Sequence, residues 1–166
     1  MPASDYELEQ AASQLADQLS QMGFTVVTAE SCTGGWVAKV LTDKTGSSAY
    51  VVGGLVTYSN DAKKALLGVT DVSLDNHGAV SEPVVREMVA GALATTGANI
   101  AVAVSGVAGP GGGSEEKPVG TVWFAWGSAV KTTEAVVQHF SGDRDQVRRQ
   151  AVLFALQGVS GFLEEA

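Results

Sequence analysis

The sequence predicts a single-domain α/β protein, a three-layer α/β/α sandwich around a mixed sheet that includes an antiparallel hairpin. Amphipathic helical segments alternate with short apolar strands along the 166 residues, which is typical of helices packed on both faces of a sheet. Two β-like segments near the C-terminus follow one another directly and favour a hairpin. No internal repeat and no long linker divides the chain, so residues 1–166 are expected to form one domain.

The first part of the chain predicts helix, strand, helix and strand in turn. Residues 5–22 place apolar side chains at three- and four-residue intervals after a capping-box sequence, which is typical of an amphipathic helix. Residues 24–29 are short and β-branched, which favours a strand, and residues 36–41 follow as a helix. Residues 50–57 form a second apolar strand, in which the glycine pair beginning at Gly53 indicates a bulge or a close contact.

The middle of the chain predicts two helices and a central strand. Asn60 is expected to cap a short helix that ends at Gly68, and Ser81 a longer helix that ends at Gly97. Residues 100–104 are wholly apolar, as in a strand that is buried on both faces.

The last part of the chain predicts a loop, a hairpin and a helix. Residues 105–118 are rich in glycine and are expected to form a loop. Residues 121–126 and 132–140 read as two strands of an antiparallel hairpin joined by a short connection at Gly127 and Ser128. Asp143, with a glutamine three residues later, is expected to begin the last helix.

The composition excludes several classes of protein. With 45% apolar and 17% charged residues, the chain is too hydrophobic to be disordered, and its one cysteine, Cys32, excludes a disulfide scaffold. The net charge of −8 argues against binding to nucleic acid or to an anionic membrane. We find no basic and apolar leader and no apolar stretch of about 18 residues, and therefore expect a cytoplasmic protein without membrane segments.

Glycine is the most unusual feature of the composition. The chain has 20 glycines in 166 residues, well above the roughly 7% of an average protein. Adjacent glycines occur at 34–35, 53–54 and 111–113. Such groups indicate tight turns or places where the backbone approaches a ligand.

The turn after the first predicted strand is a candidate catalytic site. Ser31 and Thr33 lie there at the start of a helix, where free backbone N–H groups favour developing negative charge. Residues of this type more commonly cap the helix, so both interpretations stay open at this point. Cys32 is a rival nucleophile that would need a lowered thiol pKa, although a buried, inert cysteine is the commoner case.

A nucleophilic serine needs a base, and the chain offers few. His77 lies in a turn-like segment and His139 in a predicted strand, which gives little support to a serine–histidine triad. A desolvated lysine can serve instead, and one of the adjacent Lys63 and Lys64 can face inward while the other is solvated. Two surface lysines are the alternative. One cysteine and two separate histidines do not have the spacing of a metal site.

Two further segments suit a phosphate group. The loop 105–114 follows the most apolar strand, although its sequence is neither a P-loop nor a dinucleotide fingerprint. Arg144, Arg148 and Arg149 cluster at the start of the last helix, and Lys117 lies in the glycine-rich loop. Solvated charges paired along the helix are the alternative interpretation.

Taken together and in order, six segments resemble the CinA C-terminal family. The resemblance extends from the first helix to the last, and the ordered set is far more specific than any one segment. The segments are AESCTGG (29–35), VTYSNDAK (56–63), GAVS (78–81), SGVAGP (105–110), KPVGTV (117–122) and FSGDR (140–144).

The resemblance implies an activity, a mechanism and a set of site residues. The reaction is hydrolysis of the carboxamide of nicotinamide mononucleotide to nicotinate mononucleotide and ammonia, in pyridine-nucleotide recycling, without a metal or other cofactor. Ser31 is the implied nucleophile and Lys63 the implied base. The other implied substrate-binding residues are Thr33, Gly34, Gly35, Ser48, Tyr58, Ser105 and Gly106, with Arg144 or Arg148 at the phosphate.

The chemistry of this assignment is coherent. The backbone N–H groups of the turn at Thr33 and Gly34 are expected to stabilise the tetrahedral oxyanion, and the glycines to let the ring approach the backbone. Many relatives carry a second, N-terminal domain, for which 166 residues leave no room. A non-catalytic nucleotide-binding or partner-binding domain and a hydrolase that uses Cys32 are the alternatives, and apolar strand edges favour a homodimer.

Overall fold

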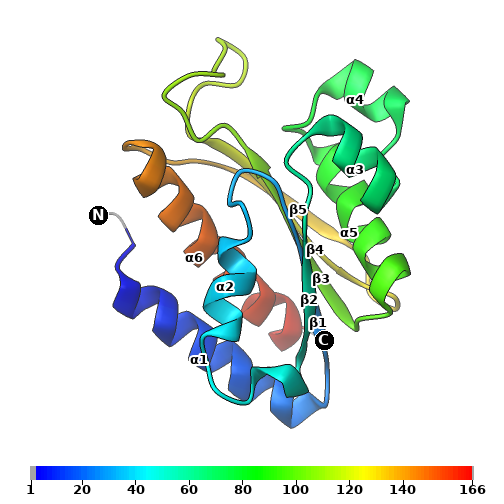
Figure 1. Cartoon of the computed structure of the whole chain (residues 1–166), viewed down its shortest axis with the longest axis vertical. Coiled ribbons are helices and arrows are strands. Elements are labelled where there is room, and N and C mark those ends of the chain that lie inside the picture. The colour runs from blue at the N-terminus through cyan, green and yellow to red at the C-terminus, as the bar shows by residue number, and fades with distance from the viewer. Residues whose placement is uncertain (1–2, 166) are drawn as a thin grey trace.

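The computed structural model describes residues 3–165, which form a five-stranded sheet between two layers of helices (Figure 1). In chain order the elements are α1 (Asp5–Met22), β1 (Val26–Glu30), α2 (Trp36–Thr42), the 3₁₀ turn η1 (Ser47–Ala49), β2 (Val51–Val56), α3 (Asn60–Leu67), α4 (Asp71–His77), α5 (Glu82–Thr96), β3 (Ile100–Gly106), β4 (Thr121–Ser128), β5 (Glu134–His139) and α6 (Arg144–Glu164).

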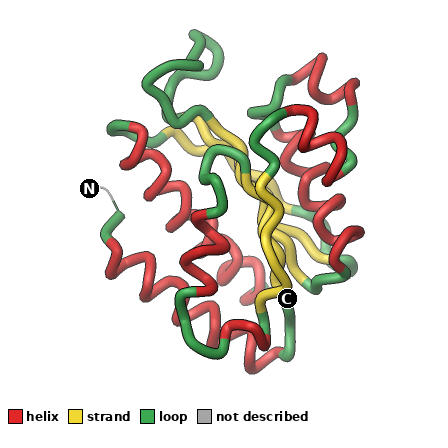
Figure 2. Tube along the Cα trace, in the orientation of Figure 1, coloured by secondary structure: helices red, strands yellow, loops and turns green. Residues whose placement is uncertain are grey.

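The sheet is mixed, with strand order β2-β1-β3-β4-β5. β1 pairs with β2 and β3 in parallel, and β3, β4 and β5 pair in antiparallel. The strands form one layer with helices on either side (Figure 2). Glu30, the last residue of β1, lies opposite Val56 of β2 and Val104 of β3. The carboxyl ends of the three parallel strands therefore coincide, and the segments that follow them meet at one edge of the sheet.

Helices cover both faces of the sheet, which confirms the predicted three-layer sandwich. α1, α2 and α6 lie on one face, and α3, α4 and α5 lie on the other (Figure 1). The first layer encloses a core in which Phe124 contacts the rings of Trp126 and Phe154. The second core lies between α5 and the sheet around Val85 and Met88. Burial of these side chains, at roughly 25 cal/mol per Å² of apolar area, holds the layers together.

Several local predictions are confirmed and others are wrong in detail. α1 has the predicted bounds because its capping box and its left-handed C-cap glycine are both formed. The register of β1 against β2 shifts beside Gly53, as expected of a bulge. The cap of α3 is Ser59, whose hydroxyl accepts the N–H of Ala62, and not Asn60. Ser81 precedes α5, but its hydroxyl donates to the Gly78 carbonyl instead of capping the helix.

Two elements differ more strongly from the sequence prediction. The first hairpin strand, β4, continues through Gly127 and Ser128, so that the connection to β5 lies at residues 129–133. The turn-like segment around His77 belongs to α4, a seven-residue helix capped by Thr70. α4 was missed because a short polar helix has no apolar stripe to reveal its period.

Candidate active site

The candidate site lies where the parallel strands end. Beyond β1, the N–H of Ser31 donates to the Val104 carbonyl at 2.9 Å, and beyond β2 the N–H of Thr57 donates to the Glu30 carbonyl at 2.8 Å. The hydrogen-bond ladder thus continues one residue past each strand. This continuation holds Ser31 in place at the edge where open α/β sheets bind their ligands.

Ser31 and Lys63 are in direct contact. The Lys63 side chain is 1% exposed, and its Nζ lies 2.8 Å from Ser31 Oγ, 2.7 Å from the Thr57 carbonyl oxygen and 3.3 Å from that of Tyr58. Carbonyl oxygens can only accept hydrogen bonds. A neutral Lys63 therefore gives its two N–H groups to these carbonyls and turns its lone pair toward the Ser31 hydroxyl, which is the geometry of a general base.

Burial adapts Lys63 to this role. Desolvation lowers the pKa of its ammonium group from 10.5 to about 8, because the hydrogen-bond partners of the buried amine are uncharged oxygens. The neighbouring Lys64 differs in both respects. It forms salt bridges with Asp61 and Asp71, and these carboxylates raise its pKa. Of the two adjacent lysines, the structure thus brings Lys63 to Ser31 and leaves Lys64 among surface carboxylates.

The rival nucleophile and bases are placed unfavourably. Burial raises the pKa of the Cys32 thiol to about 12, so that the reactive thiolate is scarce near neutral pH. His77 and His139 are exposed, and neither lines the cavity that contains Ser31. The geometry therefore favours the serine and the lysine over a thiol or a histidine.

Sequence reasoning missed Glu30, a buried carboxylate directly before Ser31. Its side chain is fully buried and accepts four hydrogen bonds of 2.7–3.0 Å, from Thr28 Oγ1, Thr33 Oγ1 and the N–H groups of Val37 and Ala38. These donors belong to β1, to the turn and to the start of α2. Glu30 therefore ties the turn to the elements on either side of it. An acidic residue at the end of an apolar strand is the sequence signal that identifies it.

Arg148 holds the same turn from α6. Its Nε donates to the Cys32 carbonyl at 3.1 Å and its Nη2 to the Thr33 carbonyl at 3.3 Å. Gly34 and Gly35 have φ angles of +61° and +98°, and a Cβ on Gly34 would lie 3.0 Å from Arg148 Nη2. Glycine suits both positions because the backbone is left-handed there, and at Gly34 also because Arg148 approaches the backbone closely.

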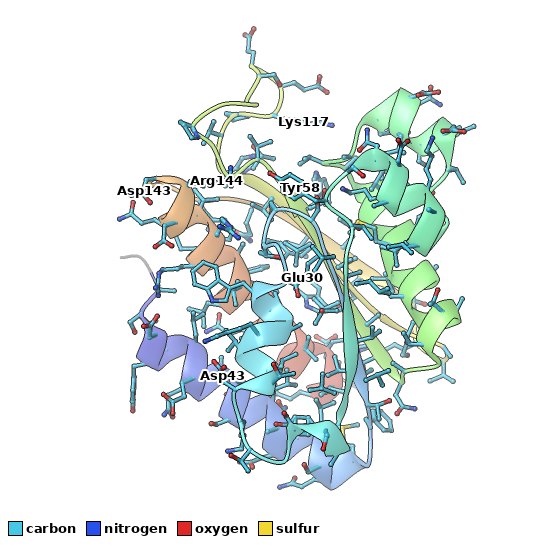
Figure 3. The ribbon with its side chains drawn as sticks, viewed as in Figure 1. Glu30, Asp43, Tyr58, Lys117, Asp143 and Arg144 are labelled. Atoms are coloured by element: carbon cyan, nitrogen blue, oxygen red, sulfur yellow. The ribbon has the colours of Figure 1, made fainter. Side chains whose placement is uncertain are left out.

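A cavity of about 260 Å³ opens over Ser31. Arg144 enters it from the start of α6 and donates to the Gly109 carbonyl at 2.8 Å and to the Tyr58 hydroxyl at 3.2 Å. Figure 3 shows Arg144, Tyr58 and Glu30 at the end of the sheet that carries the glycine-rich loop. The lining residues are Ser31, Cys32, Tyr58, Asn60, Lys63, Ala79, Val80, Ser105, Gly106, Ala108 and Arg144.

Some residues implied by the resemblance do not reach this cavity. Thr33, Gly34, Gly35 and Arg148 shape the turn beneath it and are not among its lining residues. Ser48 lies in η1, which precedes β2, and is exposed at the opposite end of that strand from Val56. The assignment of Ser48 to the pocket is therefore wrong, because β2 spans the sheet between it and Ser31.

The glycine-rich loop closes one side of the cavity. Lys117 Nζ donates to the carbonyl oxygen of His77 at the end of α4, and Ser105 Oγ donates to the Ala79 carbonyl at 2.9 Å. The loop rises above the carboxyl end of the sheet beside α4 (Figure 1). Lys117, which the sequence suggested for a phosphate, is therefore occupied by a structural contact in this arrangement.

A second hollow on the surface contains charged residues that pair with one another. This hollow, of about 700 Å³, lies between α1 and α2, and its charged residues include Asp5 and Arg149, which pair with each other. Residues 3–165 contain no group of three or more His, Cys, Asp or Glu side chains arranged to hold a metal ion. Over the same residues, every helix is too short or too polar to cross a membrane.

Sequence comparison identifies the family. The CinA C-terminal domain matches residues 8–163, nearly the whole chain. The protein belongs to the CinA C-terminal domain family. This confirms the resemblance seen in the six segments, and the Ser31–Lys63 contact lies within the matched region of this CinA domain.

Relatives of this CinA domain include curated enzymes and solved structures. The chain is 58% identical to the nicotinamide-nucleotide amidohydrolase PncC of Escherichia coli K12 over 154 residues, 93% of each chain. It is 53% identical to PncC of Pseudomonas putida over 148 residues, 89% of this chain and 92% of that one. A CinA superfamily crystal structure from Klebsiella pneumoniae superposes with a TM-score of 0.92 at 40% identity, covering 96% and 99% of the two chains.

Proposed function

We propose that this protein hydrolyses the carboxamide of nicotinamide mononucleotide to nicotinate mononucleotide and ammonia. Relatives at 51–58% identity over most of the chain carry the name nicotinamide-nucleotide amidohydrolase. The observation that carries the proposal within this chain is the 2.8 Å contact between Ser31 Oγ and the buried Lys63 Nζ. A binding domain has no need of such a pair, whereas amide hydrolysis needs a nucleophile and a base.

Neutral Lys63 starts the reaction by taking the proton of the Ser31 hydroxyl. Oγ then attacks the carboxamide carbon, from which the positive pyridinium ring withdraws electrons, and the carbonyl oxygen becomes an oxyanion. Within residues 3–165 the N–H groups of Cys32, Thr33 and Gly35 donate to no other residue, whereas that of Gly34 donates to the Ser31 carbonyl at 3.0 Å. The N–H groups left for the oxyanion, at about 3 kcal/mol per hydrogen bond, are therefore those of Cys32, Thr33 and Gly35. Of these residues, Cys32 lines the cavity.

The protonated Lys63 completes the reaction. It gives its proton to the departing nitrogen, so that ammonia leaves and an ester links Ser31 to the nicotinate carbonyl. Neutral again, Lys63 takes a proton from a water molecule that attacks this ester, and then returns the proton to Ser31 Oγ. The carbonyls of Thr57 and Tyr58 accept the remaining N–H groups throughout, which keeps the amine aimed at the reacting atoms.

The two candidate arginines have different tasks in this proposal. Arg144 lines the cavity and binds the phosphate, while Arg148 supports the turn that carries the nucleophile. We expect Arg144→Ala to raise KM by about 10- to 100-fold with little change in kcat, the effect of one charge-assisted contact. Arg148→Ala is expected to lower kcat instead. Steady-state kinetics on nicotinamide mononucleotide measures both constants, and a reversed pattern would contradict this division of roles.

Activity is expected to rise with pH as Lys63 loses its proton. With a pKa of about 8, about one Lys63 in ten is neutral at pH 7, against about one in 3,000 at a pKa of 10.5. A profile of kcat/KM should therefore climb about tenfold per pH unit below pH 8 and level off above it. A profile that is flat between pH 6 and 9 would exclude Lys63 as the titrating base.

The cellular setting completes the proposal. The reaction returns a nicotinamide nucleotide to the nicotinate form, which is a recycling step of pyridine-nucleotide metabolism. The cytoplasmic location and the homodimer stay predictions from the sequence. Because no step needs a metal, we expect ammonia release to be unchanged after treatment with EDTA, and a requirement for added metal would contradict the mechanism.

A further inference from the structure

Ser105 is a second buried serine beside the nucleophile. Glu30 pairs with Val104 across β1 and β3, and the N–H of Ser31 donates to the Val104 carbonyl. The next residue of β3, Ser105, therefore lies across from Ser31 at the spacing of neighbouring strands, about 5 Å. Its side chain is 1% exposed, and the residue lines the same cavity.

The Ser105 hydroxyl is committed in one direction. Its Oγ lies 2.9 Å from the carbonyl oxygen of Ala79, which carries no proton, so the hydroxyl must be the donor. Within residues 3–165 no N–H or O–H group donates to Ser105 Oγ in return. A hydroxyl has one proton and two lone pairs. Because its O–H group already donates to the Ala79 carbonyl, Ser105 can only accept a hydrogen bond from a ligand.

We propose that Ser105 Oγ accepts a hydrogen bond from the NH₂ group of the carboxamide and thereby distinguishes the amide substrate from the acid product. This inference rests on the proposed function and adds a specificity-determining residue to it. A carboxamide has an N–H donor to match the Ser105 lone pairs, whereas a carboxylate has only acceptor oxygens. The same contact orients the amide, so that its carbonyl oxygen is left to the N–H groups of the 31–35 turn.

The discrimination follows from the contact with Ala79. To donate to a carboxylate, the Ser105 hydroxyl would have to turn away from the Ala79 carbonyl and leave that buried oxygen without a partner. Unpaired buried polar groups are costly, so the acid is expected to bind at least about tenfold more weakly than the amide. Ser105 thus orients the amide substrate and binds the acid product weakly, which favours release of the product.

Equilibrium binding tests the proposal in an enzyme that cannot turn over. Calorimetry would compare the dissociation constants of nicotinamide and nicotinate mononucleotides for Ser31→Ala and for Ser31→Ala with Ser105→Ala. We expect the amide to be preferred about tenfold or more by the first protein, and the preference to fall about tenfold in the second. An unchanged ratio of the two constants overturns the proposal.

Two further measurements keep the test decisive. Ser73, a buried serine on α4 whose hydroxyl donates to Glu87, is not among the cavity residues, so Ser73→Ala in the same background is the matched control and should keep the ratio. If Ser105→Ala does not fold, inhibition of the wild type by nicotinate mononucleotide replaces it. Inhibition by the acid at or below the KM of the amide overturns the proposal. Ammonia release by the wild type tests the proposed function separately, so the two can fail independently.

Discussion

Replacing Ser31 with alanine is expected to lower kcat for ammonia release from nicotinamide mononucleotide by about 10⁴- to 10⁶-fold, with the fold intact. The variant keeps the cavity but lacks the hydroxyl that lies 2.8 Å from Lys63 Nζ in the wild type, so no nucleophile faces the base. Lys63→Met is expected to cause a loss of similar size, because it keeps the buried chain and removes the base. The two residues act on the same proton, so the double variant should be little worse than either single variant.

Matched variants separate this mechanism from its rivals. Lys64→Met removes the neighbouring amine, which pairs with surface carboxylates, and should keep nearly full activity. Cys32→Ala should keep most of the activity, because burial holds the thiol protonated. Loss of activity in Cys32→Ala alone would support a thiol mechanism. A wild type that binds the nucleotide and releases no ammonia would indicate a binding domain.

Replacing Glu30 with alanine is expected to lower the free energy of unfolding by about 4 kcal/mol, the largest stability effect that we predict. The reason is that the carboxylate is fully buried and accepts four hydrogen bonds from the elements on either side of the nucleophile turn. Removing it leaves these donors unpaired in a dry interior, where each costs about 1–3 kcal/mol before relaxation. Urea unfolding followed by circular dichroism measures the change.

The Glu30 prediction has a close control on the next helix. Asp43→Asn removes an exposed carboxylate at the end of α2 that pairs with Lys39, and should change stability by less than about 0.5 kcal/mol. Glu30→Gln keeps the shape but turns an NH₂ group toward donors, so we expect it to be destabilising and to lower kcat as well. A Glu30→Ala protein as stable as Asp43→Asn would show that Glu30 does not hold the turn.

Elements with strong local signals could be predicted from the sequence. α1 and α6 begin at the expected residues because a capping box depends on side chains three residues apart. The buried strand over 100–104 was recognised by its wholly apolar sequence, and β3 extends it by two residues. α4 and the true cap of α3 were missed because several polar residues in a row offer equivalent caps and turns.

The candidate site could be predicted only in part. Ser31 and Lys63 are both candidates on chemical grounds, but their local sequence by itself favours a helix cap and a solvated lysine. The six ordered segments singled them out by resemblance. Glu30 and the turn-bracing role of Arg148 were not foreseen, because their partners are backbone groups whose positions depend on how the turn packs.

The sequence by itself determined the order of the strands and of the α-helices other than α4, the α/β class, the family and the two residues proposed for catalysis. These properties are encoded in neighbouring side chains and in short ordered motifs, which can be read without knowing the fold. Only the tertiary structure decided that Lys63 is buried against Ser31, that Arg144 enters the cavity and that Ser48 is excluded from it. Burial, a lowered pKa and hydrogen bonds to distant carbonyls arise from contacts between segments that are far apart in the chain. A local sequence pattern cannot predict such contacts.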